Sequence, residues 1–225
     1  MECVKQESIN LNKMGKGYFI TLEGPEGCGK STQSRKIFQA LEKQDYKVIH
    51  LREPGATQTG EMIRNILQHR ASGEDLSSKT ELLLFEAARA QLIENVIKPH
   101  IETGGIAICD RFYDSTTAYQ GYGRGMNLEI INTINNYVSE KYQPNLTLLL
   151  DLPIEKGMER VVQRSEEKDT FEKEKIDFHK RVRKGYLKIA KSNQNRISLI
   201  DATLTIEEVY QQIQKTFKEK LNLKI

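Results

Sequence analysis

The sequence predicts an α/β fold in three layers, with a five-stranded parallel sheet between two layers of helices. Five short runs are almost continuously apolar at their centres, which is typical of parallel strands that are covered on both faces. Helical patterns separate these runs in a regular alternation, as in an open doubly wound sheet. With 225 residues, of which 38% are hydrophobic, the chain is long enough for one compact domain with a substantial core.

The expected elements follow one another along the chain. Each of the first four strands ends in a polar or charged residue and is followed by a helical pattern. The expected strands are Tyr18–Glu23, Lys47–Arg52, Gly105–Asp110, Leu146–Asp151 and Arg196–Asp201. The expected helices are Ser31–Glu42, Thr59–His69, Ser78–Ile101, Leu128–Lys141, Ile154–Gln163, Lys173–Lys191 and Thr205–Leu221.

Composition limits the class of protein. Residues 1–16 have no clear periodicity, so we expect a flexible extension before a domain of residues 17–225. The net charge of +3 is small and evenly spread, which favours no nucleic-acid partner. Cys3, Cys28 and Cys109 match no zinc or disulfide spacing, which indicates a reducing compartment. No run is apolar enough for a bilayer span or a signal peptide, so we expect a cytoplasmic protein without a membrane partner.

A phosphate-binding loop follows the first strand. The stretch GPEGCGKS fits the pattern G-x-x-x-x-G-K-[ST] between a strand and a helix. Glycines let backbone N–H groups turn toward phosphate oxygens, Lys30 supplies a cation, and the Ser31 hydroxyl is a ligand for Mg²⁺. The alternative is a glycine-rich turn that contains Lys-Ser by chance. We predict that a nucleoside triphosphate is held by Gly24, Pro25, Glu26, Gly27, Cys28, Gly29, Lys30, Ser31 and Thr32, with Cys28 only a small filler.

Two charged residues end the third strand. Ligands of open α/β sheets bind beyond the carboxyl ends of the strands, so Asp110 and Arg111 should face the same crevice as the phosphate-binding loop. A carboxylate there suits Mg²⁺ and an arginine suits a phosphate. The alternative is a structural ion pair that caps the strand.

The helix expected at Ser78–Ile101 carries Phe85 and Arg89, which lie four residues apart and therefore on one face. A ring beside a guanidinium could stack on a planar base and bind its edge. The pattern alone favours a different interpretation, with Phe85 in the core and Arg89 at its rim. Residues 164–175 are mostly charged, which indicates either a solvated face or a mobile lid.

The motifs together resemble a known family. The blocks GPEGCGKST, REPG, LLFEAAR, DRFYDSTTAYQG and DFHKRVRKGYL, in this order and spacing, are similar to those of the bacterial thymidylate kinases. The resemblance runs from about Tyr18 to Leu221. It implies a P-loop kinase fold with a short lid at about residues 160–175, a homodimer, and phosphorylation of dTMP to dTDP with ATP and Mg²⁺ in the synthesis of dTTP.

The resemblance also implies roles for single residues. Phe85 would stack on thymine, Arg89 would donate to its exocyclic oxygen, and Thr116 and Gln120 would complete the contacts to the base edge. Arg111 would bind the acceptor phosphate and Glu26 would lie near the sugar 3′-hydroxyl. Further positions implied for the site are Glu53, Pro54, Arg64, Ser115 and Tyr119 around dTMP, Ser31 and Asp110 for the metal, and Arg160 and Arg164 as lid cations.

One departure and two rival functions stay open. Related lids often carry an arginine where this chain has Thr170, so Arg164 or Lys168 replaces that charge or the lid stabilises the transition state less well. A P-loop kinase for another nucleotide or a deoxynucleoside would share the donor site but not the base-binding set. A regulator would bind ATP without turnover.

Overall fold

A five-stranded parallel sheet forms the middle layer, as the sequence predicted. The computed structural model describes residues 17–69, 73–163 and 169–225, so the extension predicted for residues 1–16 lies outside the described residues. The strands lie in the order β2-β3-β1-β4-β5 and all neighbours pair in parallel. Their bounds are β1 Tyr18–Glu23, β2 Val48–Arg52, β3 Ile106–Asp110, β4 Leu146–Asp151 and β5 Ile197–Asp201.

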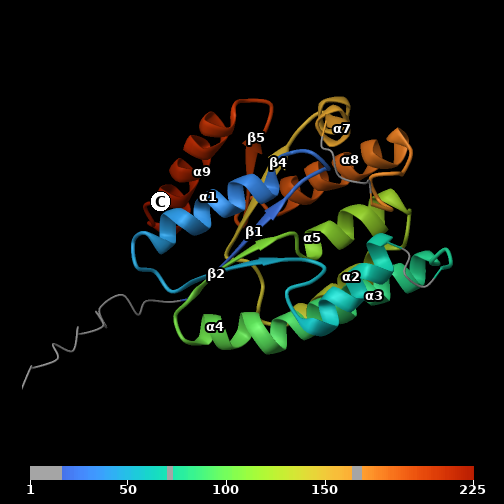
Figure 1. Cartoon of the computed structure of the whole chain (residues 1–225), viewed down its shortest axis with the longest axis horizontal. Coiled ribbons are helices and arrows are strands. Elements are labelled where there is room, and N and C mark those ends of the chain that lie inside the picture. Colours follow the sequence, from blue (N-terminus) through green and yellow to red (C-terminus); the bar gives the residue numbers. More distant parts are fainter. Residues whose placement is uncertain (1–16, 70–72, 164–168) are drawn as a thin grey trace, which may run out of the picture.

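Helices cover both faces of this sheet (Figure 1). The helices are α1 Lys30–Glu42, α2 Gln58–His69, α3 Ser78–Leu92, α4 Lys98–Glu102, α5 Tyr113–Thr116, α6 Leu128–Ser139, α7 Ile154–Gln163, α8 Ile176–Ser192 and α9 Ile206–Leu221, with π-helical segments η2 Ile93–Ile97 and η3 Thr117–Gly123. None of the helices in the described part of the chain is long and apolar enough to span a bilayer.

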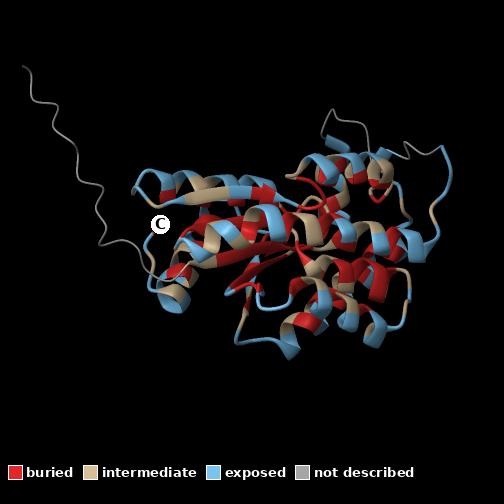
Figure 2. Cartoon of the chain, turned by 90° about the horizontal axis from the view of Figure 1, so that it is seen from below, coloured by how far each residue is buried: buried red, intermediate tan, exposed pale blue. Residues whose placement is uncertain are grey.

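The two cores follow from side-chain alternation along the strands. In β4, Leu148 and Leu150 pack with α1 and α9, whereas Leu149 packs with η3 and α8 on the opposite face. In β3, Ile108 faces α1 and Cys109 faces α3 and η2 in the same way. Buried residues therefore concentrate on the strands and on the inward sides of the helices (Figure 2).

The helices depart from expectation in two places. The segment Tyr113–Gly123 after β3 is helical, although no helix was expected there. The long helix expected at Ser78–Ile101 is divided by η2, in which the Lys98 N–H bonds to the carbonyl of Ile93. Pro99, which has no amide hydrogen, follows this wider turn. The first of these departures matters for function, because η3 supplies one wall of the site.

Candidate active site

The phosphate-binding loop connects β1 to α1 at the carboxyl edge of the sheet. Gly29 has φ +92° and precedes Lys30, the first residue of α1, so the loop enters the helix through a conformation that glycine adopts freely. Gly27 has φ +70°, and a Cβ there would lie 2.2 Å from the carbonyl oxygen of Gly157. The loop backbone is thus packed directly against α7, which carries Arg160.

Lys30 lies inside this loop. Its ammonium donates to the carbonyl oxygens of Gly24 at 3.1 Å and Pro25 at 2.9 Å, and it approaches Cys28 Sγ at 3.5 Å. Cys28 itself is buried in the core beneath the loop, consistent with its predicted role as a filler. The lysine therefore holds the loop in shape and has its charge at the centre of the cradle.

Ser31 and Asp110 meet across the gap between α1 and β3. The Ser31 hydroxyl donates to Asp110 Oδ2 at 2.5 Å, which brings two oxygen ligands of the kind that Mg²⁺ prefers to one place. Mg²⁺ is usually bound by one or two protein oxygens together with substrate phosphates and water. The residues present therefore fit Mg²⁺. The alternative, an Asp110–Arg111 ion pair, does not form, because Asp110 contacts Ser31 and Arg111 pairs with Glu26.

Arg111 points from the end of β3 toward the loop and pairs with Glu26 at 2.6 Å. Its backbone has φ +75°, a conformation that a residue with a Cβ adopts at a cost. Burial raises the pKa of Glu26, but the attraction of Arg111 and Lys30 outweighs burial and lowers this pKa to about 2. Glu26 is therefore an anion at neutral pH.

Glu23, at the end of β1, contacts the residues that surround Arg111. One carboxylate oxygen accepts from the Phe112 N–H at 2.7 Å, next to the strained residue. The other accepts from the hydroxyls of Ser115 at 2.6 Å and Tyr186 at 3.0 Å. Arg111 Nη1 donates to these same two hydroxyls, at 3.3 Å and 3.2 Å respectively. A single buried carboxyl group thus contacts both the backbone next to the arginine and the two hydroxyls to which the arginine donates.

Replacement of Glu23 by glutamine is expected to flatten the pH dependence of stability. Burial and the charge of Asp114 raise the pKa of Glu23 to about 7, against 4.5 for an unperturbed glutamate. The native state then holds a proton that the unfolded state has lost, so the free energy of unfolding falls as pH rises from about 4.5 to about 7. Without Glu23, this slope should decrease by up to about 1.4 kcal/mol per pH unit.

Urea unfolding of both proteins at several pH values measures this difference. Glu53, whose pKa burial raises to about 7 despite Arg89, titrates in the same window. The charge of Glu23 also raises this pKa, so Glu23→Gln lowers the Glu53 pKa and decreases the slope in the same direction. Equal slopes for the two proteins would show that Glu23 is ionised throughout the window.

Arg89 lies deep beneath the far end of the site. It is 1% exposed, pairs with Glu53 at 2.7 Å and also with Glu86, and its Nη1 donates to the Thr116 hydroxyl at 3.0 Å. Phe85, on the same side of α3, is only half-buried. The interpretation that the helix pattern favoured is therefore wrong for Arg89, which is not at the rim, whereas Phe85 packs partly buried against two hydrophobic clusters.

The described part of the charged run is exposed at Lys173 and Lys175, but residues 169–172 are buried or half-buried. Asp169 Oδ1 accepts from the N–H groups of Phe171 and Glu172 and forms a turn. Phe171 is buried, with its ring centroid 5.7 Å from that of Phe85. The Thr170 hydroxyl and N–H both donate to the carbonyl oxygen of Gln68 at the end of α2, so position 170 faces α2. Arg164 and Lys168 lie outside the described residues.

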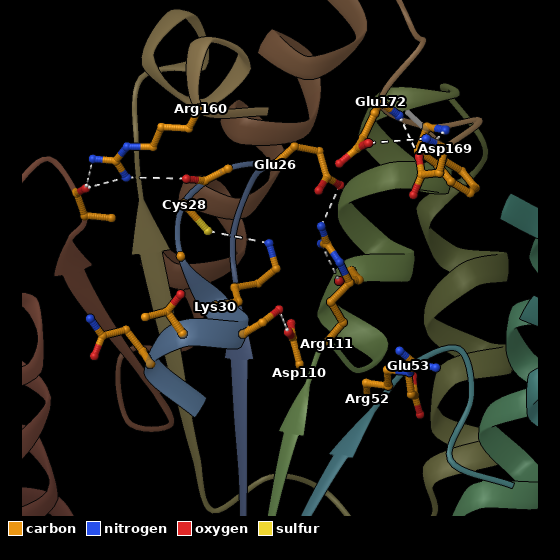
Figure 3. Close-up of a pocket in the computed structure, with 18 of the residues that line it drawn as sticks. Glu26, Cys28, Lys30, Arg52, Glu53, Asp110, Arg111, Arg160, Asp169 and Glu172 are labelled. Atoms are coloured by element: carbon orange, nitrogen blue, oxygen red, sulfur yellow. Dashed lines mark hydrogen bonds and ion pairs between the residues drawn. The ribbon is translucent and has the colours of Figure 1, made fainter. Parts of the chain in front are cut away.

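These elements enclose a cavity of about 640 Å³. In Figure 3, Lys30 and Arg160 lie on one side of it and Asp169 and Glu172 on the other. The predicted site residues that line it are Glu26, Gly27, Cys28, Gly29, Lys30, Ser31, Thr32, Glu53, Pro54, Arg64, Phe85, Asp110, Arg111, Ser115, Thr116, Tyr119, Gln120 and Arg160. Gly24, Pro25 and Arg89 lie behind its wall, where they contact Lys30 or Thr116.

Sequence reasoning missed two groups of residues. The loop from Ala202 to Ile206 after β5 lines the end of the cavity near Arg160, and the Arg160 guanidinium donates to the carbonyl oxygen of Ala202 at 3.3 Å. The position of this loop at the carboxyl end of a parallel strand could have indicated it. The second group is Glu81, which accepts a hydrogen bond from the Gln120 amide, and Arg124, which donates to Glu81. Glu81 lies 39 residues from Gln120 in the sequence, too far for spacing to indicate the contact.

Comparisons with known proteins agree over nearly the whole chain. The family model described as thymidylate kinase matches residues 22–213. A thymidylate kinase of Kosmotoga olearia is 43% identical over 199 residues, which cover 88% of this chain and 94% of that protein. One of Syntrophotalea carbinolica is 42% identical, covering 92% and 97%. The crystal structure of thymidylate kinase from Ehrlichia chaffeensis superimposes with a TM-score of 0.74 at 35% identity, covering 91% of this chain and 99% of that one.

Proposed function

This chain belongs to the thymidylate kinase family, and on that premise we propose that it transfers the γ-phosphoryl group of ATP to the phosphate of dTMP, giving dTDP and ADP. The observation that supports this most is the shared cavity: the phosphate-binding loop and the set of Phe85, Thr116 and Gln120 line one space, with Arg111 between them. A donor and a nucleotide acceptor can therefore meet at one point.

The proposed chemistry needs alignment and neutralisation of charge more than proton transfer. The attacking group is an anionic phosphate oxygen, so no strong general base is required. Lys30 and Arg160, from the loop side, and Arg111, from the acceptor side, supply cations around the transferred group. When bound at Ser31 and Asp110, Mg²⁺ neutralises phosphate charge. Glu26, an anion paired with Arg111, is suited to accept a hydrogen bond from the sugar 3′-hydroxyl.

The acceptor end is suited to a pyrimidine. Phe85 offers a half-exposed ring to the cavity. Pro54 lines the same cavity, and Arg64 donates to its carbonyl oxygen at 2.9 Å. Tyr119 donates to Glu26 at 2.6 Å, and this ring together with Ser115 forms the wall near the sugar. Donation from Arg89 to an exocyclic oxygen remains a prediction, because Arg89 lies behind Thr116 and Glu53.

Initial velocities with ATP and each of dTMP, dUMP, UMP, dCMP and AMP test the proposal. The expected result is the highest kcat/KM with dTMP. A preference for another acceptor would favour the rival nucleotide kinase, and ATP binding without transfer to any of them would favour the regulator.

Replacing Phe85 with alanine is expected to weaken the binding of dTMP far more than the binding of ATP. Stacking of a base on an aromatic side chain is worth about 1–3 kcal/mol in nucleic-acid complexes, so the Kd of dTMP should rise accordingly. Leu82→Ala is a matched control, since Leu82 is a buried residue of the same helix that does not line the cavity. It should lower stability and leave the Kd unchanged. An unchanged Kd in Phe85→Ala would make Phe85 a core residue.

The wider assignments are also proposals. We place the enzyme in the synthesis of dTTP in the cytoplasm, as a homodimer. Three exposed apolar side chains support the dimer: Met62 on α2, Leu83 on α3 and Tyr137 on α6. Helix α3 packs against both α2 and α6, so the three side chains come from neighbouring helices. A mass in solution twice that of the 25.9 kDa chain tests it.

A further inference from the structure

Gln120, at the acceptor end of the cavity, is held in one orientation from behind. It is 1% exposed, and its Nε2 lies 2.8 Å from Oε1 of Glu81. A carboxylate accepts hydrogen bonds and donates none, so the amide must turn its NH₂ group toward Glu81. Among the described residues, no donor contacts the other end of the amide. Its carbonyl oxygen is thus the atom left for a ligand in the cavity that Gln120 lines.

Glu81 is itself fixed by Arg124. The guanidinium of Arg124 donates through Nε to Oε1 of Glu81 at 3.2 Å and through Nη2 to Oε2 at 3.1 Å. Glu81 is 5% exposed, and paired guanidinium–carboxylate contacts of this kind are strongly directional. Arg124 also contacts Glu174 and the ring of Phe178, whose centroid lies 4.7 Å away. Two donors of Arg124 thus hold both oxygens of the Glu81 carboxylate.

Thr116 presents a hydrogen-bond donor to the cavity, whereas Gln120 presents an acceptor. Arg89 can only donate, so the Thr116 oxygen accepts from Arg89 Nη1 at 3.0 Å and the hydroxyl hydrogen is left to donate elsewhere. Thr116 and Gln120 are four residues apart in the helical segment after β3 and both line the cavity. The buried residues behind them thus create a donor at Thr116 and an acceptor at Gln120.

This pattern matches one class of pyrimidine edge. Thymine and uracil present a carbonyl oxygen next to a ring N–H, whereas cytosine presents an amino group next to an unprotonated ring nitrogen. We propose that Glu81 and Arg124 are positioning residues that fix the Gln120 amide as an acceptor, and that they thereby make the site select an imide base over an aminopyrimidine. This inference rests on the proposed function and names the residues that set its specificity.

The expected effect is a change in selectivity. When a donor of the site faces a donor of the ligand, or an acceptor faces an acceptor, both buried groups stay without a hydrogen bond. Each unpaired group costs about 1–3 kcal/mol, which corresponds to a change of about 5- to 150-fold in kcat/KM. Glutamine at position 81 can donate as well as accept, so the Gln120 amide is free to rotate. In Glu81→Gln the ratio of kcat/KM for dTMP to that for dCMP should fall by about 5- to 150-fold, while the ratio for dTMP to dUMP, which share the imide edge, stays constant.

Glu174→Gln is the matched control. It removes the same charge from the other carboxylate partner of Arg124 and leaves the contact between Glu81 and Gln120 in place, so the dTMP to dCMP ratio should not change. The inference is overturned if Glu81→Gln lowers both kcat/KM values by the same factor. It is also overturned if Glu174→Gln shifts the ratio as much as Glu81→Gln does.

A second variant keeps the test decisive if Glu81→Gln does not fold. Gln120→Met removes the amide and retains the volume, so the dTMP to dCMP ratio should collapse in the same direction, and an unchanged ratio overturns the inference. The two levels of proposal remain distinct. An unmodified protein that transfers no phosphoryl group to dTMP defeats the proposed function and this inference together, whereas turnover of dTMP with unmoved ratios in the variants defeats only the inference.

Discussion

Replacing Lys30 with alanine is expected to reduce phosphoryl transfer by at least about 10³-fold, because a positioned donor at a site of developing charge contributes this much or more. The Lys30 ammonium already lies within hydrogen-bonding distance of two loop carbonyl oxygens, of Gly24 and Pro25. It is therefore at the centre of the loop that would surround the phosphates. Turnover of dTMP and the Kd of ATP measure the effect.

The two loop contacts of Lys30 also determine which control variant is needed. Lys30 is 7% exposed, so alanine removes packing as well as charge, and the loss of its two loop contacts should lower the free energy of unfolding. Lys30→Met retains most of the buried stem. We expect it to be as inactive as Lys30→Ala but more stable, and circular dichroism with thermal unfolding separates the two effects. Substantial activity in Lys30→Met would remove the ammonium from the mechanism.

The sheet could be predicted from the sequence because its strands are buried on both faces. A run such as LTLLLD can be satisfied only by apolar contacts above and below, and β4 has this environment. The segment Tyr113–Gly123 has no such pattern. Its glycines and threonines disfavour a regular helix, and the π-helical form that it adopts is stabilised by packing against α8, which no local pattern encodes.

For single residues of the site, too, the sequence pattern predicted position but not burial. Spacing placed Phe85 and Arg89 on one face of a helix, but it could not give their depth. Arg89 is buried because Glu53 comes from the end of β2 and Glu86 from its own helix, and a buried guanidinium is tolerated where carboxylates pair with it. Glu23 was assigned only to a strand, and its role became visible through Tyr186, which lies 163 residues later.

Arg111 allows activity to be separated from backbone strain. Removing its side chain should lower kcat/KM for dTMP by about 10³-fold or more, because arginines at a transferred phosphoryl group contribute on that scale. Its φ of +75° makes alanine and glycine different replacements. Glycine adopts this conformation freely, so Arg111→Gly should be more stable than Arg111→Ala by about 1 kcal/mol, although both variants lose the same side chain.

The two variants also share one further cost, because each leaves the partly buried Glu26 carboxylate without its 2.6 Å partner. This cost cancels when the two variants are compared. The expected outcome is equal inactivity with unequal stability.

Arg111→Lys completes the series. Lysine keeps the positive charge but lacks the planar guanidinium that contacts Glu26, Gly24 and Tyr186 together. The activity of Arg111→Lys should therefore lie between those of the unmodified protein and Arg111→Gly. If activity instead followed stability across the three variants, Arg111 would contribute to the fold alone. The acceptor phosphate would then have to be bound by another cation of the cavity, such as Arg64, which contacts Pro54.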